Sequence, residues 1–344
     1  MTALELAQAN LLSPAVLCFG LGGLAVLARS DLRVPDGVFA ALSMYLMFSI
    51  GLRGGAELRH ADLAAIAAPI AGALALCSLI PLWSYAALRR FGGLSVENAA
   101  AIAAHYGSVS AVTFAAVTTM LDRQGTPYEG YVAVLLATME VPAIIVAIAL
   151  ARLAQSAGAN HLVASGGGGA LMLGDSPQLG RTCHHSILAE VLSSKSIVLL
   201  LGGLAIGALA GPASIDKVKP FFVDLFQGAL CLFLLELGRM AASKAGEFRK
   251  VGAFLIGFAL VMPVLHGLMG IGLAHVLGMS PGGAVVLAAL AASASYIAAP
   301  AAVQLALPEA NPGLYLTCSL AITFPFNILV GLPLYQALAQ ALYS

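Results

Sequence analysis

The most constraining feature of this sequence is a succession of long stretches that contain almost no charge. The chain has 344 residues, of which 60% are hydrophobic and only 9% are charged. A soluble domain usually carries about 25% charged residues, whereas a membrane-spanning helix needs about 20 mostly apolar residues. The composition therefore predicts an all-α protein that crosses a lipid bilayer many times.

Ten stretches are long enough to span a membrane. They are Leu11–Leu27, Val34–Leu52, Leu63–Leu88, Val96–Met120, Tyr131–Leu153, Ile187–Leu209, Lys219–Leu237, Val251–Leu277, Gly282–Leu307 and Leu314–Leu342. No basic segment precedes the first stretch, and Glu5 lies before it. We therefore expect the first stretch to be a true span rather than a cleaved signal peptide.

A polar segment divides the ten stretches into two sets of five. Residues 154–186 include Ser165 followed by four consecutive glycines. Such a segment buries too little apolar surface to offset the entropy lost on ordering. We interpret it as a flexible linker between a first repeat, residues 1–153, and a second repeat, residues 187–344.

The two halves carry similar features in the same order. The motif Leu21–Ala25 recurs as Leu201–Ala205, and Ser95 recurs as Ser280, 185 residues later. Because five spans are an odd number, the second repeat must enter the membrane from the opposite side, which predicts an inverted repeat. With the N-terminus outside, eleven of the sixteen Lys and Arg residues lie in inner loops. This asymmetry predicts that both termini are outside and the linker is cytoplasmic.

Small and hydroxyl-bearing residues interrupt the fourth and the ninth stretch. They are Gly107, Ser108, Ser110 and Thr113 in the fourth, and Ser293, Ala294 and Ser295 in the ninth. Interruptions at matching positions of two repeats indicate a transporter's binding site. Two helices broken there would direct N–H groups at one point and bind an anion without a buried Lys or Arg. Their hydroxyl and carbonyl oxygens would also suit Na⁺, although small residues serve helix packing as well.

Three further polar residues of the predicted spans are candidates for a role in the site. Glu140 precedes Pro142, and a carboxylate at that depth is costly and usually functional. It is either a cation ligand or a protonated group bonded to a neighbouring helix. Asn327 follows Pro325 in the second half and would line the same cavity. His105 titrates near neutral pH as a free side chain, yet it is more often a packed histidine.

Several classes of function are disfavoured. The formal net charge is zero, which argues against nucleic acid as a partner. The five cysteines form no CxxC pair, and Cys183, His184 and His185 are at most half a metal site. An intramembrane enzyme would need clustered His and Glu or an Asp-rich motif, and neither is present. We expect no enzyme and no cofactor; a non-transporting sensor or scaffold stays an alternative.

Three stretches resemble the sodium-dependent bicarbonate transporter family. They are Gly107–Ser110 continuing to Thr119, Tyr128–Ala143, and Ala291–Ser295 followed by Pro308–Pro312. The likeness covers essentially the whole chain apart from the linker. It implies Na⁺-coupled bicarbonate import across the bacterial inner membrane, with Na⁺ as the coupling ion. An H⁺-coupled or uncoupled carrier of another small anion or carboxylate, with Glu140 or His105 as proton relay, is the alternative.

The resemblance also implies an architecture. It has ten spans, with broken helices 4 and 9 that cross at their midpoints. Spans 3–5 and 8–10 form a core that moves, like an elevator, against a scaffold of spans 1, 2, 6 and 7. The assembly is a homotrimer, and a PII-like protein binds the cytoplasmic face in some members.

The predicted site residues follow from the two interruptions. The substrate is assigned to Gly107, Ser108, Ser110, Ser293, Ala294 and Ser295, and the cation to Ser110, Thr113, Glu140, Ser295, Tyr296 and Asn327. The family pattern places an Asp just after the second serine cluster, whereas this chain has Tyr296. Losing a carboxylate there would weaken a cation site.

Overall fold

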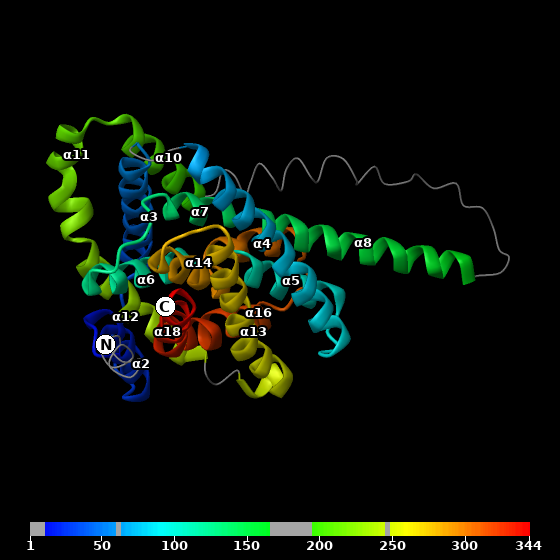
Figure 1. Ribbon diagram of the computed structural model, residues 1–344. Helices are drawn as coiled ribbons and strands as arrows, with labels where there is room; N and C mark the ends of the chain where they lie inside the picture. The colour runs from blue at the N-terminus through cyan, green and yellow to red at the C-terminus, as the bar shows by residue number, and fades with distance from the viewer. Residues whose placement is uncertain (1–10, 60–62, 166–194, 245–247) are drawn as a thin grey trace.

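In the computed structural model, residues 11–59, 63–165, 195–244 and 248–344 are described, and every element within them is helical (Figure 1). The first half contains α2 (Pro14–Leu27), α3 (Asp36–Leu58), α4 (Leu63–Arg90), α5 (Val96–Gly107), α6 (Ala111–Gln124), α7 (Val132–Met139) and α8 (Pro142–Ser165). The second half contains α10 (Lys195–Leu209), α11 (Pro212–Lys219), α12 (Phe226–Lys244), α13 (Phe248–Val276), α14 (Pro281–Ala292), α15 (Ala298–Ala306), α16 (Pro312–Leu316), α17 (Phe324–Phe326) and α18 (Leu332–Tyr343), with π-helical segments η1 (Pro220–Asp224), η3 (Thr317–Thr323) and η4 (Asn327–Gly331).

The helices have the length and composition of membrane spans. Within the described residues, seven helical segments are long and apolar enough to cross a bilayer, and three more apolar helices are shorter. The outer face of α2 exposes Leu17, Leu21 and Leu24, as expected of a helix face that contacts lipid. The chain is therefore a multi-pass, all-helical membrane protein.

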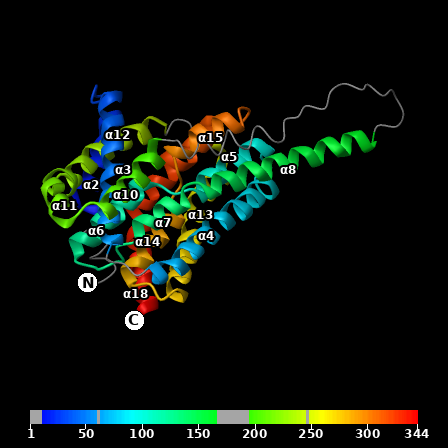
Figure 2. The ribbon, with the colours of Figure 1, turned by 90° about the horizontal axis from the view of Figure 1, so that it is seen from above.

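Two groups of helices lie side by side. In Figures 1 and 2, α2, α3, α10, α11 and α12 occupy one side, and α4, α5, α8 and α13 the other. Within the first group, α3 packs along α10 and α2 packs along α12. Glycines permit this approach, since a Cβ on Gly51 would lie 2.3 Å from the Leu200 carbonyl oxygen and one on Gly22 would lie 1.9 Å from that of Leu235. Small residues of this kind let membrane helices pack backbone to backbone.

The interrupted helices lie at the centre of the protein. Every residue of α14 from Gly282 to Ala292 is buried, as are all the residues of α5 from Ala99 to Gly107. Neighbouring helices α4, α8, α13 and α18 pack around them. Polar groups at the interruptions are thus separated from lipid by protein, which is the condition under which non-helical backbone persists at membrane depth.

The predicted linker begins too early. Helix α8 continues past Leu153 and ends at Ser165, because the intervening residues are rich in Ala and lack the glycine run. Residues 166–194 lie outside the described part of the chain, and so do Cys183, His184 and His185 and the start of the predicted sixth span. The residues that the structure describes hold no group of three or more metal-binding side chains.

Three predicted spans differ in their helical detail. The seventh begins earlier, because Pro212 starts α11 at the first helical position, where its missing N–H is not needed. The fifth is interrupted between Met139 and Pro142. The tenth contains the π-helical segments η3 and η4 instead of one regular helix. Such segments often occur at functional sites.

Candidate substrate site

The first interruption lies between α5 and α6. Ser108 has an extended backbone (φ −84°, ψ 152°), and its Oγ donates a hydrogen bond of 2.8 Å to the carbonyl oxygen of Glu140. Ser110 is the N-cap of α6, and its Oγ accepts from the Thr113 N–H at 3.2 Å. The two serines therefore have different tasks: one fixes the break to the neighbouring chain segment and the other begins the next half-helix.

The second interruption lies between α14 and α15. Ser293 also has an extended backbone (φ −77°, ψ 164°), and its Oγ donates to the carbonyl oxygen of Leu290 at 2.8 Å. The Ser295 Oγ accepts from the Ala299 N–H at 3.2 Å in the first turn of α15. Here too, hydroxyl groups end one half-helix and begin the next.

The two interruptions are bonded to each other. The Ser110 N–H donates to the Ser293 Oγ at 2.9 Å, and the Ser295 N–H donates to the His105 carbonyl oxygen at 2.8 Å. The Ser110 Oγ lies 3.3 Å from the Tyr296 hydroxyl and donates to it. Each break thus satisfies a buried backbone group of the other, which would otherwise cost several kcal/mol in an apolar environment.

This arrangement favours an anion electrostatically. The N-termini of α6 and α15 lie on either side of the bond between Ser110 and Tyr296, and each carries partial positive charge. No Lys or Arg is among the buried side chains of the described residues. The positive potential at this point therefore comes from backbone dipoles and hydroxyl donors.

The space at the crossing is small. A cavity of about 10 Å³ lies beside Ala111, Val112 and Ile297 and is closed by residues of α3 and α12. A volume of this size holds roughly one water molecule. A bound molecular anion would therefore require the side chains at the crossing, Tyr296 among them, to move.

Glu140 lies at a third interruption, which the sequence analysis did not predict. The chain leaves the helical pattern between α7 and α8, where Glu140 is 5% exposed. Its backbone oxygen accepts the Ser108 hydroxyl. Within the described residues its carboxylate has no hydrogen-bond or ion-pair partner. An unpaired buried carboxylate beside a polar crossing is a candidate for binding a cation or a proton.

Asn327 approaches the crossing from the second half. Its Nδ2 donates to the carbonyl oxygen of Ala292, the last residue of α14, at 2.8 Å, and its Oδ1 accepts from the Tyr335 hydroxyl at 3.0 Å. Gly331 leaves the necessary room, since a Cβ there would lie 2.6 Å from the Asn327 Oδ1. Asn327 therefore stabilises the exposed carbonyl end of the broken helix.

Three predicted site residues take other positions. A Cβ on Gly107 would lie 2.4 Å from the Pro81 Cγ, so this glycine permits close packing on α4. Ala294 is buried in an apolar cluster with Tyr106 and Tyr315. Thr113 contributes its backbone N–H to the Ser110 cap. The polar contacts of the crossing come instead from the serines, Tyr296 and Asn327.

His105 is a buried side chain. Its Nδ1 lies 2.7 Å from the Ala101 carbonyl oxygen, so Nδ1 carries the proton and donates it. The ring stacks on Tyr315 with centroids 4.5 Å apart. Its Nε2 has no partner within the described residues. This geometry fits the interpretation of a packed histidine.

Aromatic and hydroxyl residues that the sequence analysis omitted complete the surroundings. The Tyr106 hydroxyl lies 2.6 Å from the Thr323 Oγ1, which donates to the Ala259 carbonyl oxygen. Phe324 meets the Tyr296 ring edge-on at 5.2 Å. In the sequence, these contacts are indicated only by the hydroxyl residues and Pro325 in the segment 317–326, immediately before Asn327.

The comparisons with known proteins identify a family. No curated protein matches the chain. A family model matches residues 14–340, a range that includes both serine interruptions, Glu140 and Asn327. Because the match covers nearly the whole chain, the protein belongs to the Na⁺-dependent bicarbonate transporter superfamily and is a membrane transporter rather than an enzyme.

Proposed function

We propose that this protein imports bicarbonate by Na⁺ symport and binds its substrate where the two interruptions meet. The observation that carries the proposal is the 2.9 Å hydrogen bond from the Ser110 N–H to the Ser293 Oγ. It brings two half-helix N-termini and several hydroxyl groups to one buried point. Bicarbonate is a small planar anion, and donors of this kind replace its hydration without a buried cationic side chain.

Na⁺ would bind beside the anion through oxygen ligands. Hydroxyl, carbonyl and carboxylate oxygens suit a hard cation. The proposed ligands are Ser110, Thr113, Glu140, Ser295, Tyr296 and Asn327. With Tyr296 in place of an Asp, position 296 supplies a neutral oxygen. Glu140 is then the buried acid that is linked to the crossing, because its carbonyl oxygen accepts the hydroxyl of Ser108. No cofactor is required.

The proposed architecture is ten spans in two inverted repeats, joined on the cytoplasmic side by the segment that follows the end of α8 at Ser165. Contacts between the halves support it. The pairing of α2 with α12 corresponds to that of α10 with α3. Two loop contacts also match between the halves. The Ser280 N–H donates to the Glu129 carboxylate at 2.5 Å, and the Asn311 N–H donates to the Asn98 Oδ1 at 2.8 Å. Asn98 matches Ser280, and Glu129 matches Asn311, at an offset near 185 residues.

Transport in this proposal is an elevator motion. Spans 3–5 and 8–10 carry the crossing and move against spans 1, 2, 6 and 7, which the glycine contacts of α2–α12 and α3–α10 hold together. A pocket of about 640 Å³ between α3, α6, α7 and η1 reaches Phe114 and Thr118 of α6 and supports an access route. The proposal includes a homotrimer in the bacterial plasma membrane, with both termini periplasmic and a PII-like partner on the cytoplasmic face.

Radiolabelled bicarbonate uptake tests this function. Purified protein in proteoliposomes should accumulate bicarbonate with an inward Na⁺ gradient and not when K⁺ replaces Na⁺. Ser293→Ala should reduce uptake strongly, whereas Ser49→Ala, a buried serine of α3, should retain it. Uptake that is indifferent to Na⁺ would contradict Na⁺ coupling. Bicarbonate that stabilises folded protein without any uptake would favour a sensor or scaffold.

A second candidate is an H⁺-coupled carrier of bicarbonate or another small carboxylate. The carboxylate of Glu140, which is buried and has no hydrogen-bond or ion-pair partner among the residues that the structure describes, favours it. Under this hypothesis Glu140→Gln abolishes uptake driven by a pH gradient, while exchange of labelled for unlabelled substrate at equal pH persists. If Glu140 is instead a Na⁺ ligand, the same variant requires more Na⁺ for half-maximal uptake. Wild-type behaviour in both assays would exclude both roles.

A further inference from the structure

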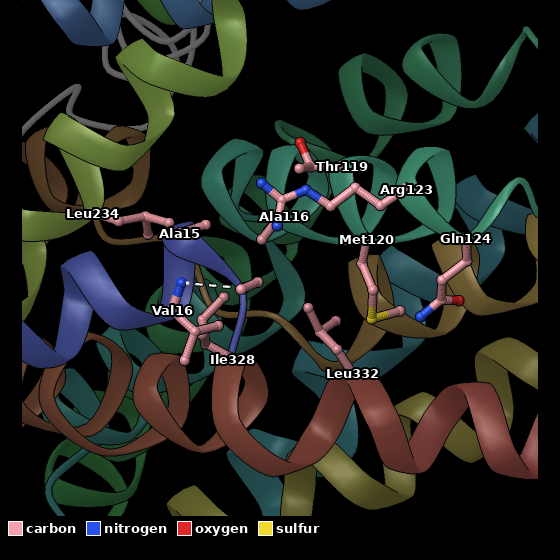
Figure 3. A pocket seen from close by; sticks show the side chains of 11 residues that line it. Ala15, Val16, Ala116, Thr119, Met120, Arg123, Gln124, Leu234, Ile328 and Leu332 are labelled. Carbon is pink, nitrogen blue, oxygen red and sulfur yellow. Dashed lines mark hydrogen bonds between the residues drawn. The ribbon is translucent and has the colours of Figure 1, made fainter. Parts of the chain in front are cut away.

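A separate pocket lies beside the C-terminal end of α6 (Figure 3). The crossing lies at the other end of this helix. Its volume is about 350 Å³, and its walls come from α2, α6, α12, η4 and α18. Pockets that bind organic ligands have volumes of about 300–1,000 Å³. The pocket is therefore large enough to hold part of an organic molecule, and its lining indicates which kind.

The lining is apolar at one end and polar at the other. The principal apolar side chains are Val16, Ala116, Met120, Leu234, Ile328 and Leu332. Figure 3 shows the Arg123 side chain reaching across the pocket on the side opposite Ile328 and Leu332. Ser13, the N-cap of α2, and Gln124 belong to the same lining. Such a division of the lining suits a molecule with a polar head and an apolar tail.

The polar end is cationic. Arg123 is the one charged residue in the lining that the structure describes, it is exposed, and no ion pair of the described residues involves it. The adjacent acid, Asp122, is bonded instead to Arg53 at 3.4 Å and to the Tyr128 hydroxyl at 2.9 Å. The Arg123 guanidinium is thus free to bind an anionic group.

The position of the pocket identifies the source of the ligand. Leu12, immediately before Ser13, is 66% exposed, and the outer face of α2 is a row of exposed leucines. In a membrane protein these residues contact lipid, so lipid lies next to the Ser13 end of the pocket. We infer that the pocket binds a phospholipid with an anionic headgroup, such as phosphatidylglycerol, whose phosphate contacts Arg123 and whose acyl chain lies against Leu234, Ile328 and Leu332.

This lipid would join two groups of helices that form opposite walls of the pocket. One wall of the pocket is α2 and α12, and the other is α6, η4 and α18. A lipid lodged between them therefore stabilises this relative position of the groups. The inference does not depend on the transported substrate, because it rests on the pocket alone.

Native mass spectrometry of the full-length, delipidated protein tests the site. Phosphatidylglycerol and phosphatidylcholine with identical acyl chains are titrated against wild type, Arg123→Gln and the control Arg90→Gln, an exposed arginine at the end of α4. Wild type and Arg90→Gln should prefer phosphatidylglycerol by about fivefold, the effect of one arginine near an anionic lipid. Arg123→Gln should show no preference.

Further arms separate the lipid from other ligands. Ala116→Trp, which fills the pocket, should weaken the binding of both lipids. Glycerol phosphate, which lacks an acyl chain, should fail to displace phosphatidylglycerol. An undiminished preference in Arg123→Gln, displacement by glycerol phosphate, or stabilisation by bicarbonate that depends on Arg123 would each overturn the inference.

Discussion

The two helix interruptions share a backbone design and differ in the chemistry that supports them. In both, a serine with extended backbone follows the first half-helix and a second serine caps the start of the next. The first interruption is anchored to a segment that carries a carboxylate, Glu140. The second is anchored to a neutral amide, Asn327, and contains the bulky Tyr296. The fold is thus repeated, while the ionisable group lies on one side alone.

In the proposed mechanism, this difference would let two ligands of opposite charge share one crossing. The N-terminal dipoles of α6 and α15 act on an anion equally from both halves. The carboxylate of Glu140 adds negative charge near the first interruption, where a cation would be favoured. Under this proposal, the feature common to both interruptions would form the anion site, and the difference between the halves would set the choice of cation.

The largest expected effect comes from Ser293→Ala. The substitution leaves the Ser110 N–H buried without its acceptor, and such a group costs about 1–3 kcal/mol. Ser108→Ala removes a donor from a carbonyl oxygen instead, with an expected cost of about 1 kcal/mol. Thermal unfolding in detergent measures both, with exposed Ser243→Ala as control. Equal losses would show that the interruptions are energetically equivalent.

Substitution of Asn327 distinguishes amide from carboxylate chemistry. Asn327→Leu removes the donor to the Ala292 carbonyl oxygen and leaves the Tyr335 hydroxyl without its acceptor, at a cost of about 2 kcal/mol. Asn327→Asp should be at least as damaging, because an ionised carboxylate cannot donate to the carbonyl. Melting temperatures of the two variants and wild type check this. A stable, active Asn327→Asp would mean that the two halves tolerate the same chemistry.

The two loop contacts between the halves should also differ in strength, because one uses a carboxylate and the other a neutral amide. Glu129 is charged and accepts both the N–H and the hydroxyl of Ser280, so Glu129→Gln should cost about 1.5 kcal/mol. Asn98 makes one neutral bond to Asn311, so Asn98→Ala should cost about 1 kcal/mol or less. Denaturant titrations of the two variants give the ranking, and the reverse order would contradict it.

The sequence predicts where the helices are interrupted better than it predicts the contacts at the interruptions. Small and hydroxyl-bearing residues within uncharged stretches mark both interruptions, because a helix that faces lipid is built mainly from large apolar residues. The beginnings of α5 and α14 follow from capping by Ser95 and Ser280. The bond between Ser110 and Ser293 joins residues 183 positions apart, and such pairing depends on how the helices assemble.

Two other features escape local reasoning for related causes. The interruption after Met139 lies in a stretch whose hydrophobic periodicity gives no boundary, and Pro142 alone marks it locally. The π-helical segments η3 and η4 depend on tertiary contacts such as those of Asn327 with α14. Gly107 was interpreted as part of the binding site, but its role in close packing becomes visible only with Pro81 beside it.

The smallest structural effect, and the most informative about the ion, is expected at Tyr296. Its hydroxyl makes a single long bond of 3.3 Å to Ser110, so Tyr296→Phe should cost about 0.5–1 kcal/mol. If that hydroxyl is a Na⁺ ligand, however, the variant should also need several times more Na⁺ for half-maximal uptake, a change that this small loss of stability does not explain. Tyr296→Asp places a carboxylate beside the N-termini of α6 and α15 and should lower the Na⁺ requirement. A Na⁺ dependence unchanged in both variants would exclude position 296 from the cation site and leave Glu140 as its one acidic ligand.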